Sequence, residues 1–377
     1  MPIPGPILHV APFLWSGAGR VIARLCADQR RAREVVLVTT GASDGLSDWP
    51  SYRRALRRAG VKHHAIDVFH RDAARFWTGA ERLSRLIDTL RPAVIHAHAG
   101  VPTALAAIAR DRSGSRARLV AQMYSWGPDR PSWMNAQDGW AFRQADRVVC
   151  SAHAYSRLLA AHGVRASRMS YLPWGLDLAA LPLREHVDAP TTVPVVGFVG
   201  RLEPRKNQVA LVEAFARLRR AQPAAQLELV GPVADQAYAR TLTATITRLQ
   251  LDAAVRVTGH VKDVARFVRR WSLFVSLSSD EGQGLAVLEA MALGVPVAAR
   301  RVAGIEDFLD HGRTGWAIPT ASATGTAAAI RNALAATDAR AVTRRARTLV
   351  EQHYDWDTMR HRFDRIDRLT KTLPNCR

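Results

Sequence analysis

Two glutamates of this sequence stand at a spacing that could serve sugar or nucleotide binding. Glu281 and Glu289 lie eight positions apart in the run SSDEGQGLAVLEAMALGVPVAA (278–299), and Gly282 and Gly284 follow the first of them. On a helix that began at Glu281, the carboxylates would share a face but lie about 12 Å apart, at 1.5 Å per residue. Two carboxylates that flank one glycosidic bond must be closer than this. The spacing therefore favours two separate roles, each accepting paired hydrogen bonds from a diol such as that of a ribose or a hexose.

The segments around Glu281 predict that it follows a strand and precedes a helix. The apolar run LFVSLS (273–278) predicts the strand, and the apolar segment 285–293 predicts the helix. Glycines in the turn let backbone N–H groups approach a ligand closely, and the positive end of the helix points to the same place. Such a turn suits phosphate or sugar oxygens. The alternative is an ordinary amphipathic helix whose glutamates have no function.

A second candidate motif is the basic loop GRLEPRKNQ (200–208), which follows the apolar run VVGFV. Its cations Arg201 and Lys206 lie just before a predicted helix. Arginine binds a phosphate bidentately and lysine acts as a point charge, so the pair could clamp a diphosphate. A basic loop by itself is usually only solvated. Beside a glycine-rich helix start, in a repeated strand–helix pattern, it is a candidate pyrophosphate site.

Short apolar runs alternate with helical patterns through both halves of the chain, which predicts an α/β fold with doubly wound parallel sheets. The runs are rich in Val, Ile and Leu without strict alternation, as expected of parallel strands buried on both faces. The expected strands lie at 7–10, 35–40, 94–98, 118–124, 147–151, 193–200, 225–231, 255–259, 273–278 and 295–300, and helical patterns at 20–31, 72–90, 103–111, 208–221 and 285–293.

The alternation breaks once, at the polar and proline-containing segment LREHVDAPTTVP (183–194). We therefore expect two Rossmann-like domains, an N-terminal one over 1–184 and a C-terminal one over 185–352, followed by a terminal segment over 353–377. We also expect a cleft between the two sheets, because ligands of such sheets bind beyond the carboxyl ends of the strands.

The formal net charge of +20 over 377 residues comes mostly from arginine and is shared by both halves. Charge that is shared is a weaker nucleic-acid signal than one basic stripe, so no nucleic-acid partner is expected. The charge reflects arginine-rich composition alone, or attraction to an anionic substrate or membrane surface. In SYRRALRRAG (51–60), a helix would place four arginines on one face, either for contact with lipid or phosphate or simply for solvation.

The compartment is predicted from what the sequence contains. Three scattered cysteines argue against a disulfide framework, and the proline-rich N-terminus has no basic region of the kind that begins a signal peptide. No apolar stretch approaches the roughly 20 residues that span a bilayer. We expect a cytoplasmic protein, with peripheral contact at the inner membrane face through the arginine-rich N-terminal domain as the further expectation.

Taken together, these motifs resemble a known family. The runs VGFVGRLEPRKNQ (196–208), EGQGLAVLEAMALGVPVAA (281–299) and AGIEDFLDHGRTGWAIP (303–319) are similar to those of retaining GT-B glycosyltransferases of the large fourth family, the glycogen-synthase and mannosyltransferase type. Looser similarity covers SGAGRV (16–21), VIHAH (94–98) and YLPWGLDL (171–178), and 354–366 resembles the terminal helix that crosses back to the N-terminal domain. The resemblance implies GT-B architecture, with the sheets of the two domains facing across the cleft.

The resemblance also implies roles for individual residues toward a nucleoside diphosphate sugar, with a UDP-sugar favoured over a GDP-sugar. It implies a transferred hexose held in part by the backbone of the glycine turn. Arg201 and Lys206 would bind the donor diphosphate, and Glu289 would bind the ribose. The transferred sugar would be bound by Glu281, Gly282, Gln283, Gly284 and Leu285. From the other domain, Gly17 and Gly19 in the loop after the first strand would approach the donor phosphates, and His98 would face the cleft. As the alternative, His96 and His98 are only histidines at a strand end.

The implied chemistry needs few further groups. In same-face attack, the leaving phosphate oxygen takes the proton of the acceptor, so no dedicated protein base and no metal ion or bound cofactor are expected. Two fixed cations and a helix N-terminus would oppose the negative charge that develops on the leaving diphosphate. The D-x-D run at 355–357 lies in the terminal segment rather than at a strand end. We therefore expect a metal-independent enzyme.

Two positions depart from the family pattern. Tyr124 stands where the family often carries a histidine, and we expect it to donate a hydrogen bond to a sugar hydroxyl; Trp174 stands in a run that usually reads P-N-G. Nearby, Trp126, Trp133 and Trp140 recur at seven-residue intervals and form either a sugar or lipid platform or a packed loop.

The sequence thus predicts a hexosyltransferase of carbohydrate biosynthesis, with an unidentified acceptor that is a glycan, a lipid-linked sugar or a small molecule. One alternative is a nucleotide-sugar hydrolase or epimerase on the same fold, which would consume the donor without an acceptor. The others are a non-catalytic polyanion-binding protein, recognisable by steep salt dependence, and a degenerate transferase kept for binding.

Overall fold

The computed structural model describes residues 5–14, 16–40, 49–69, 72–126, 130–183, 193–319 and 322–369. The chain divides into two compact units, of which unit 1 comprises Met1–Trp174 with Asp357–Arg377 and unit 2 comprises Gly175–Trp356. The boundary expected between residues 184 and 185 lies outside the described residues.

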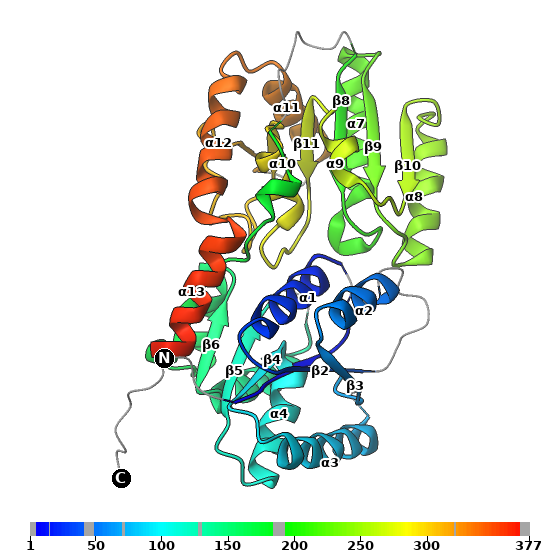
Figure 1. Cartoon of the computed structure of the whole chain (residues 1–377). Helices are drawn as coiled ribbons and strands as arrows, with labels where there is room; N and C mark the ends of the chain where they lie inside the picture. The colour runs from blue at the N-terminus through cyan, green and yellow to red at the C-terminus, as the bar shows by residue number, and fades with distance from the viewer. Residues whose placement is uncertain are drawn as a thin grey trace. The chain divides into compact units, whose positions relative to one another are not determined.

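Unit 1 is built on a seven-stranded parallel sheet in the order β3-β2-β1-β4-β5-β6-β7 (Figure 1). The order reverses between β1 and β4, the topological switch point at which ligands of such sheets bind. Every residue of β1, β2 and β4 is buried, as expected of central parallel strands. The strands are β1 (Ile7–Ala11), β2 (Val35–Thr39), β3 (Lys62–Ala65), β4 (Val94–His98), β5 (Arg118–Met123), β6 (Arg147–Cys150) and β7 (Met169–Tyr171), and the helices are α1 (Ser16–Arg30), α2 (Trp49–Arg58), α3 (Ala73–Leu90), α4 (Gly100–Arg112), α5 (Ser132–Gln144), α6 (His153–Ala161) and α13 (Trp356–Leu369).

Unit 2 is built on a six-stranded parallel sheet in the order β10-β9-β8-β11-β12-β13, with its switch point between β8 and β11 (Figure 1). Its strands are β8 (Val195–Val199), β9 (Gln226–Val230), β10 (Val255–Gly259), β11 (Leu273–Ser276), β12 (Val297–Ala299) and β13 (Trp316–Ala317), and its helices are α7 (Gln208–Ala221), α8 (Gln236–Arg248), α9 (Val264–Val268), α10 (Leu285–Ala292), α11 (Ala323–Leu334) and α12 (Ala339–His353). The predicted α/β class with two Rossmann-like parallel sheets is confirmed.

Alternate residues of β11 enter different cores, which shows how the sheet of unit 2 is covered on both faces. Val275 packs in a cluster with residues of α7 and α11, whereas Phe274 packs with residues of α10 and α12. Successive side chains of a strand point to opposite faces, so α10 and α7 cover different faces of the sheet. The sheet and its helices hold the loops after β8 and β11 in place.

Several elements differ from the prediction. The strand β3 escaped notice because its side chains are mostly exposed, and β7 and β13 are too short for an apolar pattern. Helix α1 begins at Ser16 rather than at residue 20, so Gly17 and Gly19 lie in the first turn of a helix and not in a loop. A side chain at Gly19 would place its Cβ 2.8 Å from the Leu14 carbonyl carbon, so glycine permits the close packing of this turn.

Within the described residues, no helix is long and apolar enough to cross a membrane. The four arginines expected to share a face do lie on a helix, α2, and all four are exposed: Arg53, Arg54, Arg57 and Arg58. Its single buried residue, Leu56, packs in the core of unit 1.

Candidate functional site

The two motifs of unit 2 lie at its switch point. One loop follows β8 and contains a 3-10 turn at Pro204–Lys206, and the other follows β11 and leads into α10. Strands β8 and β11 are parallel neighbours, with Leu273 opposite Val196, so both loops leave the same edge of the sheet. Sequence distance is large, but the sheet topology brings the motifs together.

Backbone groups join these two loops directly. The Ser279 N–H donates to the Arg205 carbonyl oxygen at 2.9 Å, and the Asn207 side-chain amide donates to the Leu277 carbonyl oxygen at 2.9 Å. The Arg205 guanidinium donates to the carbonyl oxygen of Asp280 at 3.1 Å. These bonds fix the basic loop against the turn that carries Glu281.

At the centre of the joined loops, Lys206 and Glu281 form an ion pair. The Lys206 Nζ lies 2.6 Å from the Glu281 Oε1, and the Ser278 hydroxyl donates to the same oxygen at 2.8 Å. The two side chains are 12% and 16% exposed. Burial alone would raise the pKa of Glu281, but Lys206, Ser278 and Arg205 favour the carboxylate and hold its pKa below the usual 4.5. Glu281 is therefore a carboxylate at neutral pH.

A second set of charges surrounds this pair. Glu203 accepts hydrogen bonds at 3.0 Å from both Arg201 and Arg205, and Arg205 also lies 3.5 Å from an Asp280 carboxylate oxygen. Burial lowers the pKa of Arg201. Burial also acts to lower the pKa of Arg205, but Glu203 and the neighbouring carboxylates raise it overall. The predicted cations Arg201 and Lys206 thus lie in one charged cluster with Glu281.

Sequence reasoning missed three members of that cluster. Arg205, Glu203 and Asp280 all lie within the quoted motifs, but their roles depend on which charges the fold sets opposite one another. The only signal in the sequence was the density of charge in GRLEPRK, which does not tell a ligand clamp from a self-paired loop. The cations of the cluster are paired with its carboxylates. An anionic ligand would therefore have to replace those carboxylates as the partner of the cations.

The glycine turn behaves as its composition suggests. Gly284 precedes α10 with a φ of +70°, in the left-handed region that favours glycine, and Gln283 is buried beside it. A missed residue, Gly304, makes the tight turn feasible, since a Cβ there would lie 2.3 Å from the Glu281 carbonyl oxygen. Gly282 belongs to the same turn, so the positive end of α10 adjoins Glu281.

Glu289 lies half-buried within α10, while Leu285 is the first residue of that helix. Because α10 begins at Leu285, Glu281 does not belong to the helix, and the spacing worked out for one continuous helix does not apply. The separate roles of the two glutamates were predicted from that spacing, and they stay a prediction. Glu281 is paired with Lys206, and Glu289 is placed by a different element.

In unit 1, His98 and Tyr124 contact one another at the switch-point edge. The Tyr124 hydroxyl lies 2.7 Å from the His98 Nδ1, and the His98 Nε2 lies 3.0 Å from the His9 Nδ1. Both histidines are fully buried, whereas Tyr124 is half-buried and stacks on Trp174 with ring centroids 5.1 Å apart. Both ring nitrogens of His98 are therefore engaged by other side chains.

Among the described residues, three buried histidines of unit 1 lie close enough together to hold a metal ion. One ring nitrogen each of His9, His96 and His98 lies within 4.8 Å of the others, and the His96 Nε2 has no partner among the described residues. However, the contact between His9 and His98 is a hydrogen bond with one shared proton. The His96 ring stacks on the His98 ring, with centroids 4.3 Å apart and an angle of 30° between the ring planes.

The aromatic cluster of unit 1 divides between core and surface. Trp126 is buried and donates to the Asn135 side chain, as a packed residue would. Trp133 and Trp140 lie on α5 with 54% and 38% of their surfaces exposed, seven residues apart and therefore on one face of the helix. Trp126 is therefore part of a packed loop, whereas the platform role of Trp133 and Trp140 stays a prediction.

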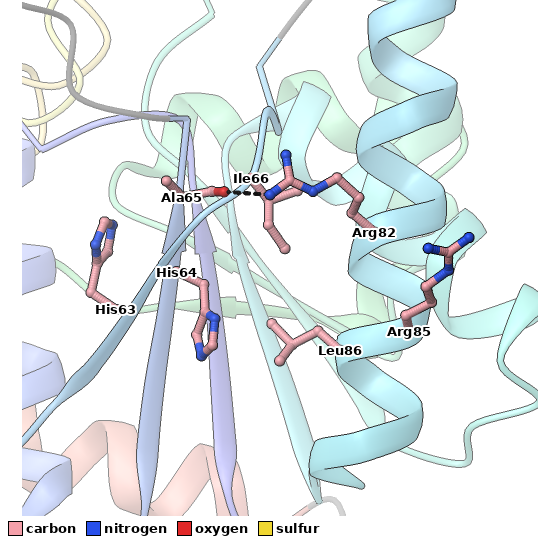
Figure 2. Close-up of a pocket in the computed structure, with 7 residues that line it drawn as sticks. All are labelled: His63, His64, Ala65, Ile66, Arg82, Arg85 and Leu86. Carbon is pink, nitrogen blue, oxygen red and sulfur yellow. Dashed lines mark hydrogen bonds between the residues drawn. The ribbon is translucent and has the colours of Figure 1, made fainter.

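A pocket of about 510 Å³ lies apart from the predicted residues, between β3 and α3 of unit 1 (Figure 2). Its lining includes His63, His64, Arg82 and Arg85. Arg82 donates to the Ala65 carbonyl oxygen at 3.2 Å, and Arg85 pairs with a glutamate of its own helix. Both guanidiniums are thus already bonded to the chain.

Comparison with known families gives one answer for both units. Residues 15–180 match the family model described as Glycosyltransferase Family 4, and residues 182–348 match the one described as Glycosyl transferases group 1. The two matched ranges cover both Rossmann-like units.

Individual curated relatives of this chain are also glycosyltransferases or sugar-polymer synthases by name. A glycogen synthase of Mycobacterium tuberculosis is 29% identical over 233 residues, which cover 60% of this chain and 55% of the relative. The lipopolysaccharide core biosynthesis glycosyltransferase LpsE of Rhizobium meliloti is 30% identical over 205 residues, which cover 52% of this chain and 55% of the relative. The chain spans about half the length of these curated relatives.

Solved structures resemble the fold along its whole length. Alr3699/HepE of Anabaena, in complex with UDP and glucose, has a TM-score of 0.80 at 19% identity, covering 96% of this chain and 99% of that one. A sucrose-phosphate synthase of Thermosynechococcus elongatus has a TM-score of 0.82 at 19% identity, covering 97% of this chain and 99% of that one. At this identity the likeness establishes the fold.

Proposed function

Because the chain belongs to the family-4 type of glycosyltransferases with the GT-B fold, we propose that it moves a hexose-type sugar from a nucleoside diphosphate sugar to an acceptor hydroxyl with retention of configuration. The observation that carries the proposal is the buried Lys206–Glu281 pair, set beside the N-terminus of α10 at the switch point of unit 2. A fixed cation and a fixed carboxylate side by side suit the two ends of such a donor, its diphosphate and its sugar.

Each charged group has a role in this proposal. Arg201 and Lys206 hold the diphosphate and oppose the negative charge that develops as it leaves. Glu281 and the backbone from Gly282 to Leu285 hold the transferred sugar. Glu289 accepts hydrogen bonds from the ribose hydroxyls. Their proximity, fixed by hydrogen bonds between the two loops, supplies the preorganisation that electrostatic catalysis requires.

The proton of the acceptor needs no protein base in this scheme. It passes to the leaving phosphate oxygen as the new glycosidic bond forms on the face from which the diphosphate departs. No metal ion takes part in the proposed reaction, since the cations of the basic loop neutralise the diphosphate. Activity that persists in EDTA would support this, and activity restored only by Mg²⁺ or Mn²⁺ would refute it.

We favour a UDP-sugar as the donor, because similar structures were solved with UDP and with UDP-glucose. The acceptor remains a class with three members: a glycan, a lipid-linked sugar or a small molecule. The four exposed arginines of α2 support a cytoplasmic enzyme in peripheral contact with the inner membrane face. Sedimentation with anionic vesicles, compared with neutral ones, tests that contact.

The first experiment is a thermal-shift panel with UDP, GDP, ADP, dTDP and CMP, on the wild type and on Lys206→Ala. A ligand at about 100 times its Kd stabilises the native state by about 2.7 kcal/mol. We expect UDP to shift the wild type, and the variant to show a smaller shift from its own baseline. No shift with any nucleotide would refute the proposal. Donor consumption without acceptor would instead indicate a hydrolase or epimerase.

A further inference from the structure

Three histidines lie on one face of the central sheet of unit 1. His9 of β1 and His96 of β4 are directly opposite in the register of these parallel strands, and His98 lies two residues further along β4. Side chains two residues apart on a strand point to the same face, so all three rings lie on one side of the sheet. Their centroids are 4.3 to 5.3 Å apart, and each residue is at most 1% exposed.

Polar rings are unexpected at this place. The residues that alternate with them along β1 and β4 are aliphatic, as is usual for the central strands of a parallel sheet. A buried polar atom is costly unless it has a partner, yet the His96 Nε2 is buried and has none among the described residues. The His96 ring stacks on Phe363 of α13 with centroids 5.2 Å apart, which satisfies no nitrogen. The face therefore carries a ligating atom that the protein leaves unused.

The other two rings are already oriented by their outer nitrogens. The His9 Nε2 lies 2.7 Å from the Gln29 Oε1, and an amide oxygen only accepts, so the Nδ1 of the neutral ring keeps its lone pair. The His98 Nδ1 lies 2.7 Å from the Tyr124 hydroxyl, whose oxygen can accept a proton. The inner nitrogens, His9 Nδ1 and His98 Nε2, face each other at 3.0 Å. Histidines that ligate a metal are held in this way, with the far nitrogen bonded to an oxygen.

We propose that His9, His96 and His98 bind one divalent transition-metal ion, of the class of zinc, in a structural site that ties β1 to β4. One ring nitrogen of each histidine lies within 4.8 Å of the other two. At Zn–N distances of about 2.0–2.1 Å, tetrahedral ligand nitrogens lie roughly 3.3 Å apart, so the facing pair is close to that spacing and His96 must approach by roughly 1.5 Å at most. Imidazole suits zinc, copper and nickel, whereas magnesium and calcium prefer oxygen ligands.

The ion would take the place of the proton that His9 and His98 share. On binding, that proton leaves the His98 Nε2 and is carried by the His98 Nδ1, where the Tyr124 oxygen accepts it. The three rings stay neutral, as ligating imidazole must, and no proton is released. Three protein ligands leave the fourth position of a tetrahedral ion to water.

The competing assignment is that hydrogen bonds alone hold these rings, with a buried water on His96. Zinc binding distinguishes the two. The full chain, stripped with EDTA and desalted, is titrated with Zn²⁺ in competition with a coloured zinc indicator, and Co²⁺ serves as the spectroscopic probe. We expect one equivalent of zinc per chain and the visible spectrum of tetrahedral Co²⁺. A wild type that does not compete with the indicator would overturn the proposal.

His96→Leu is the variant that decides the site. Leucine removes the unpartnered nitrogen from an apolar face, so the metal-free variant should unfold at the same temperature as the metal-free wild type or at a higher one. His64→Gln changes an exposed histidine of β3 in the same unit and is the matched control. Zinc should raise the unfolding temperature of the wild type and of the control. His96→Leu should bind zinc at least about 100-fold more weakly and lose that shift.

Gln29→Leu keeps all three ligands and removes only the acceptor that orients His9, so it should weaken zinc binding by about 10–100-fold. Equal zinc affinity in the wild type, His96→Leu and Gln29→Leu would mean an adventitious ion only, bound by surface groups, and would overturn the proposal. None of these measurements uses sugar transfer. The zinc site can therefore fail while the proposed function stands, and the proposed function can fail while the site stands.

Discussion

Replacing Lys206 with methionine should leave Glu281 as a buried carboxylate without its nearest cation. Lys206→Met keeps most of the apolar stem and removes only the ammonium, so packing changes little. In the native protein the two charged atoms are 2.6 Å apart, and the side chains are only 12% and 16% exposed. The variant therefore measures how much unit 2 depends on this pair.

Removing one partner of a buried ion pair typically costs about 3–5 kcal/mol, because the remaining charge stays desolvated. Ser278 still donates to the Glu281 carboxylate at 2.8 Å, and Arg205 still favours its charge. We therefore expect the lower end of the range, about 3 kcal/mol. With a slope of about 2 kcal/mol per molar urea, the unfolding midpoint should fall by about 1.5 M.

The control and the pH dependence make this prediction specific. Lys262→Met alters an exposed lysine of the same unit and should change stability by less than about 0.5 kcal/mol. The folded pKa of Glu281 lies below 4.5, so its ionised form stabilises the protein above that pH, and this contribution is lost as the pH falls through the folded pKa. The deficit of Lys206→Met should accordingly shrink as the pH falls from 4.5 through the folded pKa of Glu281, where its carboxylate becomes protonated.

A double variant completes the cycle. Adding Glu281→Gln to Lys206→Met removes the stranded charge, and it should recover most of the lost stability at pH 7. The reasoning is refuted if Lys206→Met is as stable as Lys262→Met at pH 7. It is refuted equally if the deficit is the same at pH 7 and pH 4, because the loss would then not come from the charge of Glu281.

Three further substitutions probe the turn and the helix that follow. Glu289→Gln should weaken UDP binding by about 10–100-fold in calorimetry, as expected for hydrogen bonds to a charged acceptor, and unchanged affinity would remove it from the site. Gly284→Ala should lower the free energy of unfolding by about 2 kcal/mol more than Gly312→Ala in urea melts. Both glycines have a positive φ, but only a Cβ at Gly284 would clash, 2.8 Å from a side-chain atom. Equal losses in the two variants would show that backbone strain alone is responsible. Gly304→Ala should displace the Glu281 backbone and abolish the UDP-dependent thermal shift, and a retained shift would mean that the turn can move without loss of the site.

Much of the fold could be predicted from the sequence, since buried parallel strands leave continuous apolar runs. The run VVLVT becomes β2, with every residue buried, and LFVS becomes β11. Strand β3 could not be found in this way, because an edge strand with exposed side chains is held by backbone pairing to β2 and carries no apolar signature. Helix α1 likewise begins earlier than its apolar pattern, although glycine has a weak helix propensity, and its first turn packs Gly19 closely against the backbone of Leu14.

The candidate site, too, could be predicted in part from local sequence, while its contacts depend on the fold. The sequence by itself determined which residue types were available, namely a glycine turn with Glu281 and a basic loop with Lys206, because those motifs are local. Only the tertiary structure decided that Lys206 pairs with Glu281 across 75 positions, since that contact depends on β8 and β11 being neighbours in the sheet. It also decided that Gln29, His9, His98 and Tyr124 are joined by hydrogen bonds, because these residues come from four separate parts of the chain that only the fold of unit 1 brings together.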